Sequence, residues 1–180
     1  MTRLTTERLT LRPFTLHDLE PHARLYEDPE ITRWLGDGPW VGAEARARSE
    51  RAVRRFVAHW NDHGFGVWAV QERSSRRFLG QCGFNTLENT LGTTEVEILW
   101  ALEQRAWGHG YATEAAHAAL AYGFDVVGLD RVVALARPQN GPSRRIMDKL
   151  GMRWEKELDV FGVPAVYYSI DVSHSHPSGG

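Results

Sequence analysis

This chain of 180 residues has a single cysteine, no long hydrophobic run and almost no excess of charge of either sign. The lone cysteine, Cys82, excludes an intrachain disulfide framework and favours a reducing compartment. No segment has the apolar length of a membrane span, and the N-terminus lacks the apolar core of a signal peptide. The net charge of −2 gives no electrostatic reason to expect nucleic acid or a membrane as partner. We therefore expect a cytoplasmic protein.

The composition is that of an ordinary globular chain. Hydrophobic residues make up 42% and charged residues 24% of the sequence, and the length suits one domain with a sizeable core. We expect this domain to span residues 1–172. Residues 173–180 are polar and end in glycine, so we expect a disordered tail there.

Hydrophobic patterning predicts alternating strands and helices, and hence an α/β protein. The clearest helix is residues 43–61, whose mostly apolar positions fall on one face. That face comprises Ala45, Ser49, Ala52, Val53, Phe56 and Trp60. Further helices are expected after Thr15 and at residues 29–35, 111–124 and 142–150. Strands are expected at residues 9–14, 65–72, 78–84, 93–102, 131–136, 152–158 and 166–172.

Residues 104–115, QRAWGHGYATEA, place two glycines where a strand ends and an alanine-rich helix begins. Gly108 and Gly110 allow a tight turn whose N–H groups point outward, and a helix N-terminus adds unpaired donors and partial positive charge. Such a loop suits a phosphate or pyrophosphate. A Walker loop is excluded because Tyr111 follows the second glycine, and a dinucleotide fingerprint is excluded because position 113 is Thr.

The ordered set of motifs resembles one family. GxGYATEA follows a strand, NGPS spans Asn140 to Ser143, and KLGM spans Lys149 to Met152. These motifs resemble the GNAT superfamily of acetyl-CoA-dependent N-acetyltransferases, and within it the RimJ/RimL-like branch. The resemblance implies a single-domain α/β fold, with a mixed, mostly antiparallel central sheet that is splayed at its middle and covered by helices on both faces. It also implies transfer of an acetyl group from acetyl-CoA to a primary amine, by direct attack in a ternary complex.

The resemblance assigns most of the motif residues to the binding of acetyl-CoA. Backbone N–H groups of residues 107–112 would hold the pyrophosphate, and Arg105 or Arg145 could meet further phosphate charge. The strand Ile98-Leu99-Trp100 would pair with the pantetheine amides. The residues expected to bind acetyl-CoA are Ile98, Leu99, Trp100, Arg105, Trp107, Gly108, His109, Gly110, Tyr111, Ala112, Asn140, Ser143 and Arg145.

Two residues are candidates for proton transfer. Glu97 aligns with the acidic residue of the branch's central strand and is the favoured general base, with Glu95 two residues earlier as the alternative. Many members of the superfamily carry a tyrosine acid in the helix after the Asn, but the matching position here is Met147, which cannot donate a proton. Ser143 is the remaining candidate to contact or protonate the leaving thiol. Ser143 could equally be only a residue at the start of the helix, and Asn140 only an Asx-turn.

The motifs do not identify the acceptor amine. Trp34, Trp40, Glu95 and Phe161 are candidates to bind it, although the aromatic residues could instead anchor the core. The branch acetylates protein N-termini and small-molecule amines, and either fits. A larger donor such as succinyl-CoA, or a non-catalytic acyl-CoA-binding module, stays open, as does the choice between monomer and homodimer. No metal is expected, because His59 and His63 lack a third ligand nearby.

Overall fold

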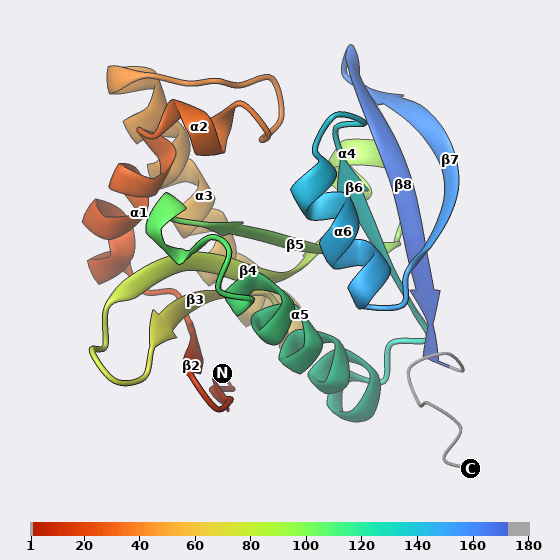
Figure 1. The fold of residues 1–180 in the computed structure, drawn as a ribbon, viewed down its shortest axis with the longest axis horizontal. Helices are drawn as coiled ribbons and strands as arrows, with labels where there is room; N and C mark the ends of the chain where they lie inside the picture. The colour runs from red at the N-terminus through yellow and green to blue at the C-terminus, as the bar shows by residue number, and fades with distance from the viewer. Residues whose placement is uncertain (1, 173–180) are drawn as a thin grey trace.

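The computed structural model describes residues 2–172, which form a central sheet with helices on both faces (Figure 1). The strands are β1 (Leu4–Thr5), β2 (Leu9–Pro13), β3 (Val67–Glu72), β4 (Phe78–Thr86), β5 (Val96–Leu102), β6 (Arg131–Ala136), β7 (Arg153–Val160) and β8 (Val163–Asp171). The helices are α1 (Leu19–Tyr26), α2 (Pro29–Thr32), α3 (Gly42–His63), α4 (Glu88–Leu91), α5 (Tyr111–Tyr122) and α6 (Gly141–Lys149). The tail expected at residues 173–180 lies outside the described residues.

The eight strands are ordered β1-β2-β3-β4-β5-β6-β8-β7, and every neighbouring pair is antiparallel except β5 with β6. This arrangement confirms the fold class expected from the sequence. The strand predicted at residues 93–102 begins only at Val96, and the short helix α4 was not predicted.

Two hydrophobic clusters attach the helices to opposite faces of the sheet. On one face, α1 and α3 contribute Leu25, Val53 and Phe56 to a cluster that includes Val67 and Ala69 of β3. On the other face, α5 packs its small residues against Trp68, Phe84 and their neighbours. The face of α3 predicted from its periodicity is buried as expected. No helix within residues 2–172 has both the length and the apolar character to cross a membrane.

The sheet parts between β5 and β6. The two strands share one residue pair, Glu97 with Val133, whereas β4 remains paired with β5 as far as Leu102. Beyond Glu97, the edge of β5 that faces β6 therefore has no strand partner. Side chains alternate across this sheet, so Leu99 and Ala101 join the α1–α3 cluster while Ile98, Trp100 and Leu102 join the α5 cluster. Glu97 shares the parity of Leu99 and faces the α1–α3 side.

A polar chain is buried within the α1–α3 cluster. His22 of α1 has 0% exposure; its Nδ1 lies 2.7 Å from Ser49 Oγ of α3 and its Nε2 lies 2.6 Å from Gln81 Oε1 of β4. The rings of Phe14, Tyr26 and Phe56 surround the imidazole. Burial lowers the pKa of His22 to about 4, and the hydrogen bond with Gln81 offsets only part of that effect.

This lowered pKa predicts acid sensitivity. In the unfolded chain His22 takes up a proton near its ordinary pKa of 6.5, whereas in the folded chain it does so only near pH 4. The stability that neutral His22 provides is therefore fully present above pH 6.5 and is lost as the pH falls toward 4. We expect His22 to account for roughly 3 kcal/mol of that loss. Urea unfolding of the protein and of His22→Phe at pH 7 and pH 4.5 measures it, and His17→Gln, at an exposed position, is the matched control. An equal pH dependence in His22→Phe and the parent would contradict the assignment.

Candidate active site

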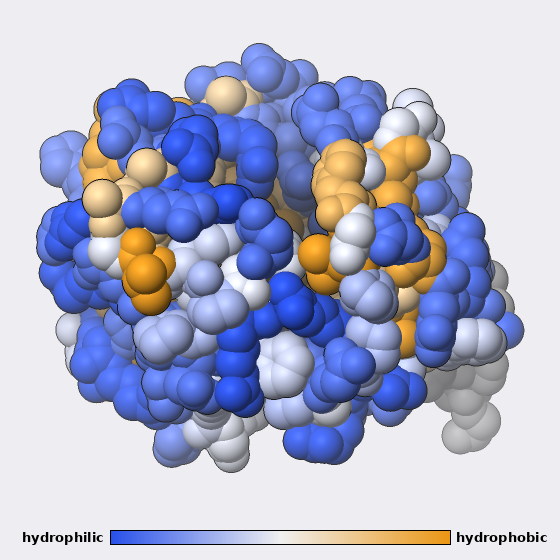
Figure 2. Space-filling model, turned by 90° about the horizontal axis from the view of Figure 1, so that it is seen from above, coloured by the Kyte–Doolittle hydropathy of each residue, from blue (hydrophilic) through white to orange (hydrophobic). Residues whose placement is uncertain are grey.

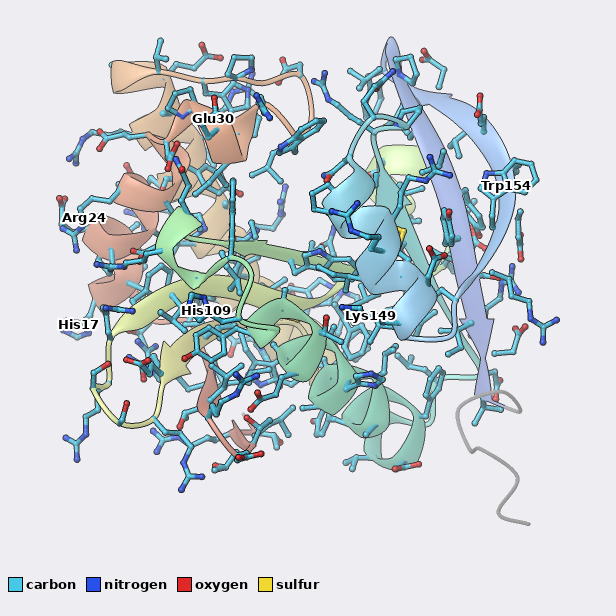
Figure 3. All side chains as sticks on the ribbon, in the orientation of Figure 1. His17, Arg24, Glu30, His109, Lys149 and Trp154 are labelled. Carbon is cyan, nitrogen blue, oxygen red and sulfur yellow. The ribbon has the colours of Figure 1, made fainter. Side chains whose placement is uncertain are left out.

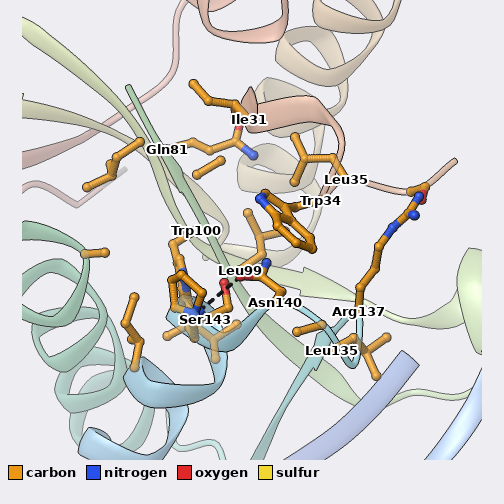
Figure 4. Close-up of a pocket in the computed structure, with 18 of the residues that line it drawn as sticks. Ile31, Trp34, Leu35, Gln81, Leu99, Trp100, Leu135, Arg137, Asn140 and Ser143 are labelled. Carbon is orange, nitrogen blue, oxygen red and sulfur yellow. Dashed lines mark hydrogen bonds between the residues drawn. The ribbon is translucent and has the colours of Figure 1, made fainter. Parts of the chain in front are cut away.

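A cleft with a volume of about 990 Å³ opens where β5 and β6 part. Its walls come from α2 and the loop that follows it, from α3, from β5, from the loop before α5, from the start of α6 and from the β7–β8 turn. Figure 2 shows the surface hollowed between the two halves of the molecule, with hydrophobic side chains along its border. Figure 4 shows residues of these separate elements converging on the cavity.

The glycine loop forms one end of the cleft. Gly108 and Gly110 line it with φ of +76° and +78°, a backbone conformation that residues with a side chain rarely adopt. A Cβ at Gly108 would meet no atom within 4 Å, so the loop leaves open space in front of its backbone. Within residues 2–172 the N–H groups of Gly108, His109 and Gly110 donate no hydrogen bond, and the first three N–H groups of α5 have no partner inside the helix. This array of free donors fits an anionic group such as a pyrophosphate.

Arg8, which lies near the N-terminus, binds this loop and fixes its position. Its Nη1 donates to the carbonyl of His109 at 2.9 Å, its Nε donates to Glu114 Oε2 at 2.7 Å, and its guanidinium lies over the ring of Tyr111. Glu114 also accepts from the Thr6 hydroxyl at 2.5 Å. The sequence reasoning missed Arg8, because nothing local links a residue near the N-terminus to a loop about a hundred positions later.

The start of α6 lies across the cleft from β5. Asn140 is 8% exposed and caps α6, since its Oδ1 accepts the N–H of Ser143 at 3.2 Å (Figure 4). Asn140, Ser143 and Arg145 all line the cleft, as do Leu99 and Trp100 of β5. Asn140 thus has the capping role considered from sequence and also faces the cavity.

Glu97 lines the cleft at the β5 position that pairs with β6. Burial raises the pKa of its carboxyl to about 7, against the opposing effects of the Arg55 charge and of the Leu135 backbone. A carboxyl with such a pKa can exist in either protonation state near neutral pH, which is the property that a general base requires.

Aromatic side chains form the other end of the cleft. Trp34, Trp40 and Phe161, the aromatic candidates for acceptor binding, all line it. Trp40 is 8% exposed and donates its Nε1–H to Asp37 at 2.9 Å, so it also anchors the loop after α2. Phe161, at the β7–β8 turn, is 81% exposed.

Three predicted site residues do not line the cleft. Arg105 forms an ion pair with Glu103. The imidazole of His109 is exposed on the loop before α5 and stacks on Tyr111 (Figure 3). Glu95 precedes β5 and accepts a hydrogen bond from the Tyr167 hydroxyl at 2.5 Å. The other predicted residues, namely Ile98, Trp107, Tyr111 and Ala112 with those described above, are brought together around the cavity.

The structure adds polar residues that the sequence did not indicate. Arg55 of α3, Tyr26 of α1, Gln81 of β4 and Arg137 after β6 all line the cleft. Arg55 lies beside the apolar face of α3, a helix with several exposed arginines. Its sequence context is like theirs, so the sequence did not indicate that Arg55 lines the cleft. No group of three or more potential metal ligands is found in the part of the chain that the structure describes.

Comparison with known proteins gives a consistent result. A family model described as an acetyltransferase (GNAT) domain matches residues 8–153. YkkB, an uncharacterized protein of Bacillus subtilis (strain 168), is 32% identical over 175 residues, covering 93% of this chain and 94% of YkkB. The crystal structure of an acetyltransferase from Agrobacterium tumefaciens str. C58 superposes with a TM-score of 0.81 at 25% identity, covering 94% of each chain. A ribosomal-protein-S5-alanine acetyltransferase from Vibrio fischeri has a TM-score of 0.74 at 16% identity, covering 98% of this chain and all of that one, and shares the fold.

The raised pKa of Glu97 predicts that its ionised form lowers the free energy of unfolding. Because its pKa is raised, the stability that Glu97 contributes is fully present below the ordinary value of 4.5 and is lost as the pH rises through about 7. We expect Glu97→Gln, which stays neutral, to be more stable than the parent at pH 8 by roughly 1–3 kcal/mol and to show no such gain at pH 4.5. Chemical unfolding at the two pH values tests this, with Glu88→Gln on the exposed side of α4 as control. A gain of the same size at both pH values would contradict it.

Proposed function

The chain belongs to the GNAT acetyltransferase family, and from this premise we propose that it transfers an acetyl group from acetyl-CoA to a primary amine. One observation carries the proposal. The free N–H groups of the glycine loop and the carboxyl of Glu97 open onto the same cleft, at the point where the central strands part.

The residues of the cleft fit acetyl-CoA along its length. The N–H groups of residues 108–112 would hold the pyrophosphate, whereas the N–H of Trp107, also expected there, already donates to the carbonyl of Gln104 at 2.9 Å. Arg145 on α6 supplies a positive charge on the same cavity. The unpartnered edge of β5 at Leu99 and Trp100 offers backbone groups to the pantetheine amides, as an added strand would use them. Asn140 would contribute its side-chain amide to the same segment.

The chemistry divides between the donor and the protein. When bound, acetyl-CoA supplies an acetyl group activated as a thioester. The amine nitrogen bonds to the acyl carbon as the carbon–sulfur bond breaks, and Glu97 accepts the proton that the nitrogen loses, directly or through a water. The sulfur keeps the bonding electron pair, and the Ser143 hydroxyl, which lines the cleft, would donate a hydrogen bond or proton to it. Met147, at the position of the tyrosine in many relatives, is 1% exposed and has no proton to give.

We further propose that the chain lies within the RimJ/RimL-like branch and acts in the cytoplasm. The motif block around the glycine loop supports the first proposal. The second is supported by the single cysteine, Cys82, which has no disulfide partner in the sequence. Burial raises the pKa of the Cys82 thiol. Cys82 is therefore a poor nucleophile, which supports direct transfer over an acetyl-cysteine intermediate.

The pyrophosphate assignment predicts that Gly110→Asp weakens the binding of CoA at least about tenfold, because a carboxylate would stand where the anion binds. Gly128→Asp is a matched control. Gly128 has the same φ of +78° and open space around it, but it does not line the cleft. Isothermal titration with CoA should therefore separate the two variants. Equal affinities would show that the loop does not hold the pyrophosphate.

The assignment of Glu97 as base predicts that Glu97→Gln lowers kcat at least about tenfold and leaves the affinity for CoA unchanged. In the parent, kcat/KM should rise with pH through about 7 as Glu97 loses its proton, and this rise should be absent from the variant. Thiol release from acetyl-CoA, followed across a panel of amines, measures both quantities. Unchanged turnover would exclude Glu97 as the base, and CoA binding with no turnover of any amine by the parent would favour a binding module. Faster turnover with succinyl-CoA would favour the larger donor.

A further inference from the structure

We call the part of the cleft lined by α2, the loop after it, α3, Glu97 and Arg137 its acceptor end, and this part carries an excess of positive charge. Four arginines line it, namely Arg33, Arg48, Arg55 and Arg137, whereas only two carboxyl groups do, those of Asp37 and Glu97. Two of the arginines are neutralised locally. Arg33 pairs with Glu30 at 3.1 Å, and Arg48 pairs with Asp37 and with Glu44, both at 3.0 Å.

The guanidinium of Arg137 donates its hydrogen bonds to backbone carbonyls and not to a carboxylate. Its Nη2 donates to the carbonyls of Gly36 at 2.8 Å and Gly38 at 3.2 Å, which ties the loop after α2 to the end of β6 across the cleft (Figure 4). Its Nε is buried without a partner in the described part of the chain. The positive charge of Arg137 is therefore not cancelled by any carboxylate.

Among the described residues of the acceptor end, Arg55 is the arginine whose guanidinium is not already engaged. Within residues 2–172 its guanidinium has no hydrogen bond and no ion pair, and its Cζ lies 5.8 Å from the centroid of the Phe56 ring. Its charge acts on two groups that line the same cleft, the hydroxyl of Tyr26 and the carboxyl of Glu97. Tyr26 from α1 and Glu97 from β5 therefore share the cleft with Arg55 and lie within reach of its charge, and Gln81 from β4 lines the same cleft.

We propose that the acceptor is an amine that also carries a carboxylate close to its amino group, which Arg55 binds while the amine faces Glu97. This inference rests on the proposed function and names its substrate class. A guanidinium binds a carboxylate through paired hydrogen bonds, and here no protein carboxylate takes up those donors. The same wall repels a polyamine or an aminoglycoside, whose additional positive charges would approach uncancelled arginines. The apolar side chains of Ile31, Trp34 and Leu35 give the rest of the acceptor a hydrophobic surface.

The test compares acceptors that differ only in the carboxylate. Thiol release from acetyl-CoA is measured with each of the twenty amino acids, with the corresponding amino-acid amides, and with spermidine and an aminoglycoside. A peptide arm compares sequences that begin with Asp or with Asn, so that a carboxylate on the first residue of a peptide is distinguished from that of a free amino acid. We expect at least one carboxylate-bearing acceptor to exceed its amide partner in kcat/KM by at least about tenfold.

Arg55→Gln should abolish this preference mainly by raising KM for the carboxylate-bearing acceptor, with the affinity for CoA unchanged. Arg55→Lys, which keeps the charge but loses the paired donors, should retain part of it. Arg54→Gln is the matched control, because Arg54 is exposed like Arg55 but pairs with Glu50 and does not line the cleft. Thermal unfolding of the three variants verifies that each is folded.

The outcomes separate this inference from the proposed function. Acetylation of amides or polyamines as efficiently as carboxylate-bearing amines would overturn the inference and leave the acetyltransferase proposal intact. A carboxylate preference that survives in Arg55→Gln would overturn the role of Arg55. Binding of CoA without acetylation of any amine would overturn the proposed function and, with it, the acceptor class.

Discussion

Beyond Glu97 and Val133, the two central strands have no backbone hydrogen bonds between them, and the site depends on that parting. A gap inside a sheet would ordinarily leave costly unpaired N–H and C=O groups, because the backbone must be satisfied wherever it is buried. Here β4 continues to pair with β5 to its end, while β8 pairs with β6 along its whole length. The sheet therefore stays intact on both sides of the gap, and the unpaired edge of β5 is left available to a ligand. The gap also joins the two faces of the sheet, so a loop on the α5 side and a carboxyl on the α1–α3 side can serve one cavity.

On the α1–α3 side of the sheet, burial lowers the pKa of His22 and raises the pKa of Glu97. His22 has a polar partner at each ring nitrogen, so the neutral imidazole is fully satisfied and stabilises the core. Glu97 has the charge of Arg55 and a hydrogen bond from the Leu135 backbone to favour its ionised form, and burial outweighs them. Its carboxyl is therefore held close to the balance between the two protonation states. Burial thus gives a structural residue in the packed core and a titratable one on the wall of the cleft.

The sequence was informative where its patterns are local. Periodicity placed the buried face of α3, a run of small and apolar residues placed β6, and paired glycines placed the loop and the start of α5. It was uninformative where position depends on tertiary packing. Strict alternation put Glu95 on the face of Glu97, but the strand begins only at Val96, and Glu95 instead meets Tyr167 of β8. Arg55 could not be distinguished from the solvated arginines of α3, because its exposure to the cleft depends on where α3 crosses the sheet.

The contact between Arg8 and Glu114 shows how such long-range packing supports a local motif. Glu114 lies in the first turn of α5, where an uncompensated carboxylate would oppose an anion bound at the helix N-terminus. Arg8 and Thr6 take up that carboxylate, and Arg8 at the same time fixes the carbonyl of His109. The loop is thereby held in a shape that leaves its N–H groups free, and the negative charge nearest to them is neutralised. Since Arg8 is partly exposed, the ion pair contributes little to overall stability, and its principal effect is on the electrostatic potential at the loop.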